Sequence, residues 1–173
     1  MTIETPYLPG AAAPVRVRPV IPADRDALLA LAPRLLIGMA PWREPDKMHA
    51  FMRDAITAAL GDTNDADRAD VAVFVAVDSR GGRLGFVTVA RNVDFTGDVQ
   101  AYVGELAVAA HAEGAGVGQA LMGAAEGWAR AQGYRLIVLD TGVANARARA
   151  LYARRGYTEE SVRLVKILDI EQL

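Results

Sequence analysis

The sequence contains no cysteine and only two histidines among its 173 residues. The absence of cysteine excludes disulfide bonds, thiolate metal sites and a cysteine nucleophile, and it fits a reducing compartment. The two histidines, His49 and His111, do not suggest a metal site. We therefore expect a cytoplasmic protein without a metal, in which any base or nucleophile comes from another residue type.

The sequence also lacks an excess of basic charge and a long apolar run. Nineteen Lys and Arg stand against 21 Asp and Glu, which gives a formal net charge of −2. No large basic surface would then attract nucleic acid. No stretch approaches the roughly 18 consecutive apolar residues that a membrane helix needs. We expect small partners, and neither nucleic acid nor a membrane.

Length and composition favour one globular domain. A chain of 173 residues, 52% of them hydrophobic and 23% charged, is long enough to bury one core. Residues 1–14 contain three prolines and a glycine without periodicity, so we expect a flexible N-terminal arm. Residues 15–173 are expected to form the single domain.

Hydrophobic periodicity predicts alternating helices and strands along this domain. Period-2 alternation or short apolar runs predict strands, and apolar residues on one helical face predict helices. The strand candidates are residues 15–20, 71–77, 84–90, 101–109, 136–139 and one or two strands within 162–168. The helix candidates are residues 24–35, with Asp24 at the N-cap, 44–60, 118–133 and 145–156. This order predicts a mixed α/β (α+β) sheet with helices on its faces.

A glycine loop joins the strand at 101–109 to the following helix. Gly114, Gly116 and Gly118 alternate with Ala115 and Val117 just before that helix begins. Backbone N–H groups at such a junction can bind phosphate oxygens, although a flexible turn without a ligand has the same pattern.

Two other phosphate-binding motifs do not match this loop. Gln119 and Ala120 stand where a Walker loop has Lys and Ser or Thr. Leu121 stands where a dinucleotide-binding loop has its third glycine.

A second motif makes the interpretation more specific. Residues 145–157 read N-x-x-A-x-x-L-Y-x-x-x-G-Y in their fixed positions, downstream of a strand ending L-x-V and a loop x-G-x-G-x-G. Together these motifs resemble the GNAT superfamily of acyl-CoA-dependent N-acyltransferases. The resemblance implies a mostly antiparallel central sheet of six to seven strands, flanked by about four helices and split between the fourth and fifth strands. It also implies acetyl-CoA (coenzyme A) as the acyl donor.

The resemblance assigns the cofactor site residue by residue. Backbone groups of the glycine loop and helix start would bind the pyrophosphate of coenzyme A; these are Gly114, Ala115, Gly116, Val117, Gly118 and Gln119. Backbone groups of Leu106 and Val108 would pair with the pantetheine arm in the split of the sheet. Glu113 departs from the family, which usually has Arg or Gln there, so Glu113 should point to solvent or pair with a cation.

The resemblance also places two residues of the last helix. Tyr152 stands where the family has a general acid that protonates the departing thiolate; a phenol is protonated at neutral pH. Asn145 stands where the family contacts the cofactor arm, and a helix N-cap explains the same residue equally well.

Glu105 is the carboxylate set within the central strand, directly before Leu106. An alkylammonium must lose a proton before its nitrogen can attack, so Glu105 is a candidate general base, directly or through water. It could instead bind a cationic substrate or lie at a solvated edge. The candidates for contact with the acceptor are Trp42, Phe95 and Tyr102.

The leading hypothesis is an N-acetyltransferase in which a primary amine, of a small molecule or a protein, attacks acetyl-CoA directly in a ternary complex. A regulatory module that binds coenzyme A without turnover is the alternative. An interaction domain that binds no coenzyme A is the third possibility. The family resemblance also makes a homodimer through the last strands possible.

Overall fold

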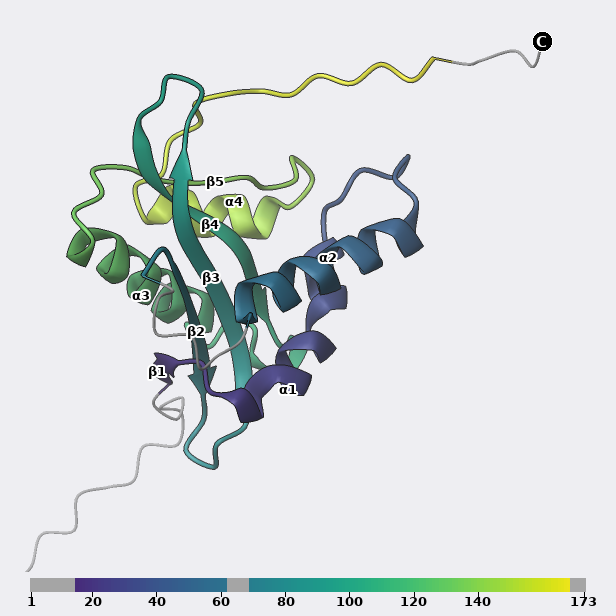
Figure 1. Cartoon of the computed structure of the whole chain (residues 1–173). Coiled ribbons are helices and arrows are strands. Elements are labelled where there is room, and N and C mark those ends of the chain that lie inside the picture. Colours follow the sequence, from purple (N-terminus) through teal and green to yellow (C-terminus); the bar gives the residue numbers. More distant parts are fainter. Residues whose placement is uncertain (1–14, 62–68, 169–173) are drawn as a thin grey trace, which may run out of the picture.

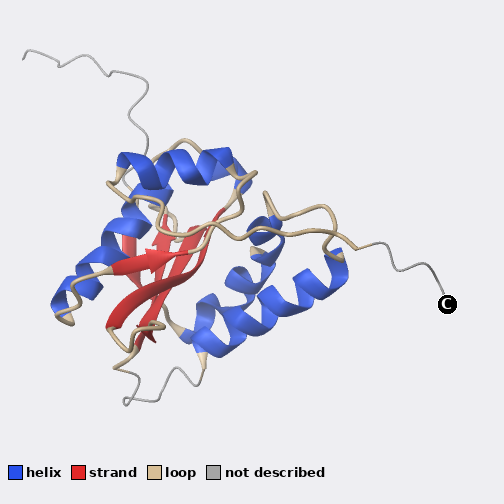
Figure 2. Ribbon diagram, turned by 90° about the horizontal axis from the view of Figure 1, so that it is seen from above, coloured by secondary structure: helices blue, strands red, loops and turns tan. Residues whose placement is uncertain are grey.

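The computed structural model describes residues 15–61 and 69–168 and forms one sheet with helices on both faces (Figures 1 and 2). The predicted N-terminal arm, residues 1–14, lies outside the described residues. The strands are β1 (Arg16–Pro19), β2 (Val71–Val77), β3 (Arg83–Val93), β4 (Val99–Val108) and β5 (Ile137–Leu139). The helices are α1 (Arg25–Ala30), α2 (Pro45–Leu60), α3 (Val117–Ala131) and α4 (Ala146–Arg154). Short 3₁₀ turns are η1 (Pro22–Asp24), η2 (Ala32–Leu36) and η3 (Ala110–Ala112).

The sheet has the order β1-β2-β3-β4-β5. The first four strands pair antiparallel, and β5 pairs parallel with β4. The mixed, mostly antiparallel sheet and the four helices agree with the sequence-based expectation. The expected count of six to seven strands was wrong, because the described residues form five.

The missing strand is the one expected within residues 162–168. Residues 158–168 have no regular structure and are exposed throughout. In Figure 1 this segment, drawn in yellow, runs away from the body of the molecule. Its alternating apolar residues could form a strand only beside another strand, and within the described chain none lies alongside them. The apolar residues of this segment favour a strand, but the hydrophobic pattern alone does not show whether another strand is available to pair with it.

Each face of the sheet carries its own hydrophobic core. Alternate residues of a strand point to opposite faces, and the buried sets follow that rule. Val75 and Phe86 pack with Leu28 of α1 and Ile56 of α2 on one face. The other face packs against α3, and its buried residues include Ala76, Val87, Val89, Val103, Leu121 and Met122. The helix α4 joins this second core through its partly buried Leu151 and Tyr152.

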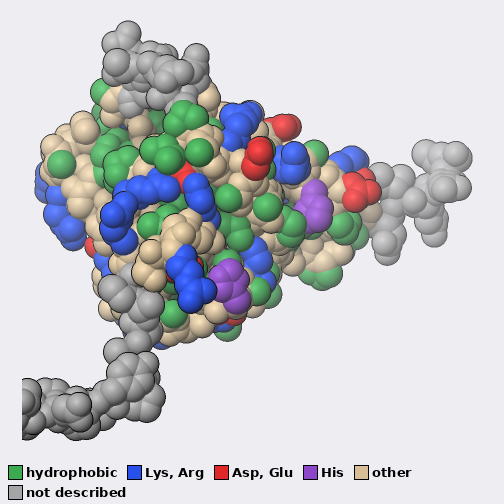
Figure 3. Space-filling model, turned by 90° about the horizontal axis from the view of Figure 1, so that it is seen from below, with side chains coloured by type: hydrophobic (Ala, Val, Ile, Leu, Met, Phe, Trp, Pro, Cys, Tyr) green, Lys and Arg blue, Asp and Glu red, His purple; other side chains and the backbone are tan. Residues whose placement is uncertain are grey.

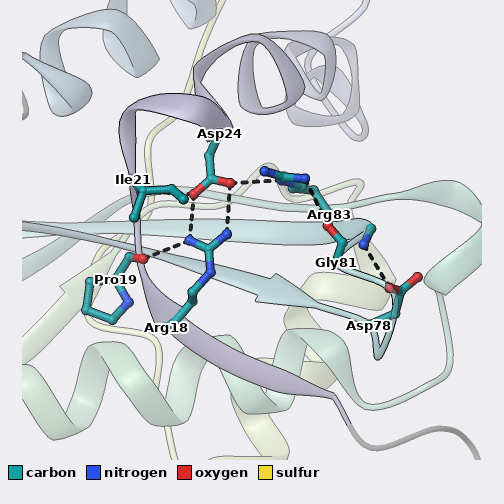
Figure 4. Close-up of polar contacts among 8 residues, drawn as sticks. Arg18, Pro19, Ile21, Asp24, Asp78, Gly81 and Arg83 are labelled. Carbon is teal, nitrogen blue, oxygen red and sulfur yellow. Dashed lines mark hydrogen bonds and ion pairs between the residues drawn. The ribbon is translucent and has the colours of Figure 1, made fainter.

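The sequence suggested Asp24 as the N-cap of α1. Asp24 occupies that position, but its side chain makes no capping hydrogen bond. Its fully buried carboxylate accepts hydrogen bonds from Arg18 of β1 at 2.6 and 2.9 Å and from Arg83 of β3 at 2.8 Å (Figure 4). The backbone N–H of Ile21 donates a further bond at 2.9 Å. Asp24 therefore ties the start of α1 to two strands.

The surface shows mixed charge on the face seen from below. Basic and acidic side chains lie there among hydrophobic ones (Figure 3). In the described residues, no helix is long and apolar enough to cross a membrane.

Candidate active site

A cavity of about 480 Å³ opens where β4 and β5 part. The two strands pair only from Ala101 opposite Ile137 to Val103 opposite Leu139. Beyond that point β4 continues beside β3 alone, and residues 103–108 line the cavity on one side. Residues 139–142 line it on another side. The expected split between the fourth and fifth strands is therefore present.

An irregularity in β4 turns its backbone toward this cavity. The register between β3 and β4 shifts across Thr88, where Gly104 and Glu105 together face one residue of β3, as in a β-bulge. Before the bulge, the N–H of Ala101 points to β5 and donates to Leu136. After it, the N–H of Ala109 points to β3 and donates to Leu84 at 2.8 Å.

The bulge changes which residues face the split. Backbone groups alternate in direction along a strand, so those of Leu106 and Val108 point away from β3. The carbonyl of Val108 indeed accepts a bond from Arg34, a cavity residue, at 3.1 Å. Leu106 and Val108 thus face no neighbouring strand on this side of β4, and their pairing with a pantetheine arm stays a prediction.

The glycine loop forms another wall of the cavity. Gly114 and Gly116 have φ angles of +82° and +80°, a left-handed conformation that favours glycine. A Cβ at either position would meet no atom within 4 Å, so the backbone conformation is what requires glycine there. Gly116 is the N-cap of α3, whose first backbone N–H groups have no partner within the helix. These groups and the helix dipole suit an anion.

The loop residues expected to bind pyrophosphate are mostly at the cavity. Five of the six line it, and Ala115 lies in the same loop without lining it; the five are Gly114, Gly116, Val117, Gly118 and Gln119.

Glu113 pairs with cations, one of the two outcomes expected for it. One carboxylate oxygen accepts a bond from Arg34 of η2, and the other accepts a bond from Arg147 of α4. All three residues line the cavity. Positive charge therefore lies beside the glycine loop despite the carboxylate at position 113.

Glu105 lies partly buried on the cavity wall and bonds to Thr88 of β3. The Thr88 hydroxyl accepts a bond from the Glu105 N–H at 2.8 Å and donates one to the Glu105 carboxylate. Burial raises the pKa of the Glu105 carboxyl, and the hydrogen bond from Thr88 opposes that shift. A carboxylate with a raised pKa is a stronger base toward an ammonium proton.

Tyr152 and Asn145 line the same cavity from α4 and its N-terminus. Burial raises the pKa of the Tyr152 phenol, so the group stays protonated at neutral pH. Asn145 caps α4 by accepting a bond from the N–H of Ala148 at 3.1 Å. Its side-chain amide also donates to the carbonyl of Ile37 at 3.2 Å. Asn145 is thus both a helix cap and a cavity residue. Its contact with the cofactor arm stays a prediction.

The three residues expected to contact the acceptor do not line the cavity. Trp42 and Phe95 are 51% and 97% exposed. Tyr102 donates to Asp140, a cavity residue, at 3.1 Å. Burial, with Asp140 beside the phenol, raises the pKa of Tyr102 to about 12. Their role in acceptor binding remains a prediction.

The structure adds residues that the sequence analysis did not select. Thr88, Arg34 and Arg147 contact predicted site residues, and Gly38 lies against Asn145 and Gly142, which line the cavity. A Cβ on Gly142 would lie 2.3 Å from the Gly38 carbonyl, so these two segments touch. No local pattern marks such residues, because their partners lie far away in the sequence. Among the described residues, no group of three metal-ligating side chains occurs.

These features define a class of α/β protein in which two diverging strands and a helix N-terminus surround one cavity. The chain belongs to the acetyltransferase (GNAT) family, whose model matches residues 36–157. The family resemblance drawn from the two sequence motifs is thereby confirmed.

Solved structures share the fold over almost the whole chain. A candidate acetyl transferase from Pyrococcus furiosus is 21% identical, with a TM-score of 0.70 over 90% of this chain and 100% of its own. Glucosamine-6-phosphate N-acetyltransferase from Arabidopsis thaliana is 16% identical, with a TM-score of 0.61 over 90% and 99%. An aminoglycoside antibiotic 6'-N-acetyltransferase from Acinetobacter baumannii is 15% identical, with a TM-score of 0.63 over 91% and 100%. Among curated proteins, none matches the sequence.

Proposed function

We propose that this protein transfers the acetyl group of acetyl-CoA to a primary amine by direct attack within a ternary complex. The observation that carries the proposal is the common cavity. It brings together the glycine loop at the start of α3, the free edge of β4 after the bulge, and the side chains of Glu105 and Tyr152.

The donor would lie between β4 and β5. The N–H groups at Gly116 to Gln119 would bind its pyrophosphate, and the backbone of Leu106 and Val108 would pair with its pantetheine arm. An N–H near Val108 would also stabilise the oxyanion that develops on the thioester carbonyl. Such a contact is typically worth roughly 2.7–4 kcal/mol.

Two side chains would move the protons. Glu105, directly or through a water, would accept the proton of the ammonium, so that the amine lone pair can attack the carbonyl carbon. The carbon–sulfur bond then breaks, and Tyr152 would give its proton to the departing thiolate. The raised pKa of Glu105 strengthens it as a proton acceptor, and the raised pKa of Tyr152 keeps its phenol protonated until the thiolate departs.

The acceptor is a primary amine of a small molecule or of a protein. The names of the Arabidopsis and Acinetobacter proteins specify N-acetylation of glucosamine-6-phosphate and of an aminoglycoside antibiotic, which supports an amine as the acceptor. Trp42, Phe95 and Tyr102 would contact the acceptor outside the cavity itself.

The test combines binding and turnover. Thermal melting with and without acetyl-CoA measures binding, and release of free thiol with a panel of amines measures transfer. We expect a raised Tm and thiol release that depends on the amine. Stabilisation without turnover on any amine would support a regulatory module that binds coenzyme A, and no stabilisation at all would contradict both functions.

A further inference from the structure

Three charged side chains form a cluster at the edge of the cavity beside the glycine loop. We call Arg34, Glu113 and Arg147 the arginine–glutamate cluster. Glu113 directly precedes Gly114, and each of its carboxylate oxygens accepts a bond from a different guanidinium. The cluster carries one negative and two positive charges, so positive charge remains after pairing.

The two arginines reach Glu113 from distant parts of the chain. Arg34 belongs to η2, which follows α1, and Arg147 belongs to the first turn of α4. Arg34 is further held by its bond to the carbonyl of Val108, at the end of β4. Both guanidinium groups are therefore positioned where β4, the glycine loop and α4 meet.

We propose that Arg34 and Arg147 bind a phosphate group of the acyl donor, and that Glu113 pairs with both arginines until that phosphate displaces its carboxylate. The inference rests on the function proposed above. A guanidinium binds carboxylate and phosphate with the same planar set of donors, so one anion can replace the other. A phosphate diester or monoester next to the helix N-terminus would gain the backbone N–H groups as well.

The exchange requires little free energy. Arg147 is 61% exposed, and Arg34 and Glu113 are each about 30% exposed in their side chains. Ion pairs that contact solvent contribute little to stability. After release, Glu113 can turn its carboxylate to solvent. A carboxylate next to an anion site is thus compatible with donor binding, because the donor phosphate can displace it from the arginines.

The ligand chemistry is a phosphate ester rather than the acyl or thiol part of the donor. The arginines should therefore contribute to binding of coenzyme A and nothing to binding of pantetheine, which lacks phosphate. This difference separates phosphate binding from a general structural effect on the cavity.

The experiment measures Kd for coenzyme A and for pantetheine by calorimetry, in the wild type and in Arg147→Gln, Arg34→Gln and Glu113→Gln. Arg147→Gln should weaken coenzyme A binding about tenfold, the loss of one hydrogen bond to a charged group. Arg34→Gln should do the same if it folds. Glu113→Gln should tighten coenzyme A binding about threefold or more, because no carboxylate competes for the arginines. Pantetheine affinity should stay unchanged in Arg147→Gln and Glu113→Gln, whose side chains do not contact the Val108 carbonyl.

The matched controls come from the neighbouring ion pair of Arg149, also on α4, with Glu159. Neither residue lines the cavity. Arg149→Gln and Glu159→Gln remove the same charges and should leave both Kd values unchanged.

Two results would overturn the inference while leaving the proposed function intact. One is wild-type binding of coenzyme A with no loss in Arg147→Gln beyond that of Arg149→Gln. The other is weaker binding of coenzyme A in Glu113→Gln at an unchanged Tm. Failure of the wild type to bind coenzyme A would instead contradict the proposed function and the inference with it.

Discussion

At the scale of single residues, the pKa of Glu105 depends on the Thr88 side chain that contacts it. Thr88 binds both the N–H and the carboxylate of Glu105, and this hydrogen bond counteracts the rise in the pKa of Glu105 that burial causes. A general base works only when deprotonated, so the rate should rise with pH through the pKa of Glu105. Thr88→Val removes a contact that lowers this pKa and should therefore move the rise to higher pH.

Glu105→Gln tests the same role directly. We expect kcat to fall about 100-fold and the rise of rate with pH to flatten, measured as kcat against pH with a saturating amine. If the pH profile of Glu105→Gln matched that of the wild type, Glu105 would bind substrate rather than accept its proton.

Tyr152 offers a cleaner substitution, since Tyr152→Phe removes only the hydroxyl. The ring would still pack near Tyr157, whose ring centre lies 5.8 Å away. We expect kcat to fall about 100-fold or more with little change in KM for acetyl-CoA, because the proton is needed only as the thiolate leaves. Tyr157→Phe is the matched control, as the Tyr157 hydroxyl faces Glu126 at 3.4 Å. An unchanged kcat in Tyr152→Phe would remove the general acid from the mechanism.

At the scale of elements, α3 begins and ends next to glycines with the same backbone conformation. Gly116 at its start and Gly133 beyond its end both have φ of +80°, and a Cβ at either would meet nothing within 4 Å. Replacing either glycine costs about 1–2 kcal/mol of backbone strain. Only Gly116 borders the cavity.

Because Gly116 and Gly133 share this conformation, a substitution at Gly133 can serve as the control for the same substitution at Gly116. Gly116→Glu should abolish binding of coenzyme A, because a carboxylate would enter the anion site, whereas Gly133→Glu should lower Tm to a similar extent and bind normally. Calorimetry and thermal melting measure the two effects separately. Normal binding by Gly116→Glu would show that the pyrophosphate does not lie at this loop.

Most elements were predicted from the sequence because their signals are local. The helix at 145–156 appears as α4, with Asn145 as its cap, and Gly156 adopts the left-handed conformation expected after a helix. The bulge in β4 could not be predicted, since it depends on how β4 pairs with β3 around Thr88. That bulge decides that the backbone of Leu106 and Val108, rather than that of Glu105 and Ala107, faces the cavity.

At the scale of the whole molecule, Asp24 connects the first strand, the first helix and β3 (Figure 4). Burial by itself would raise the pKa of Asp24. The hydrogen bonds from Arg18, Ile21 and Arg83 outweigh it and lower the pKa to about 2. Because this pKa is lower in the folded state, the stabilisation is complete above the ordinary value near 4 and is lost as pH falls through about 2.

Asp24→Asn should therefore lower the free energy of unfolding by about 3 kcal/mol at pH 7, because two guanidinium groups lose their buried partner. The difference from the wild type should shrink by about 2 kcal/mol as pH falls from 5 to 2. Urea unfolding at several pH values measures both. Asp26→Asn, an exposed carboxylate of the same helix, is the control. A pH-independent difference would show that the charge of Asp24 is not what stabilises the fold.

The exposed segment 158–168 bears on the homodimer that the family resemblance makes possible. It presents five large apolar side chains to solvent: Val162, Leu164, Val165, Ile167 and Leu168. Clustered exposed apolar residues are rare on monomers, and β5 pairs on one edge only within the described sheet. We expect a dimer in which this segment contacts a second copy. Light scattering should show a dimer for the full chain and a monomer for Leu164→Asp with Ile167→Asp; a monomeric wild type would contradict this expectation.

Local sequence was enough to specify the types of the elements, the glycine loop and the segment from Asn145 to Tyr157, and with these motifs the family. Periodicity, caps and backbone conformations depend on neighbouring residues, so they can be read locally. What surrounds these motifs depends on the packing of distant elements. Glu105 meets Thr88 from another strand, and Glu113 meets Arg34, 79 positions away. Such contacts form only when distant elements pack together, so their effects on proton transfer and anion binding follow from the fold rather than from any local pattern.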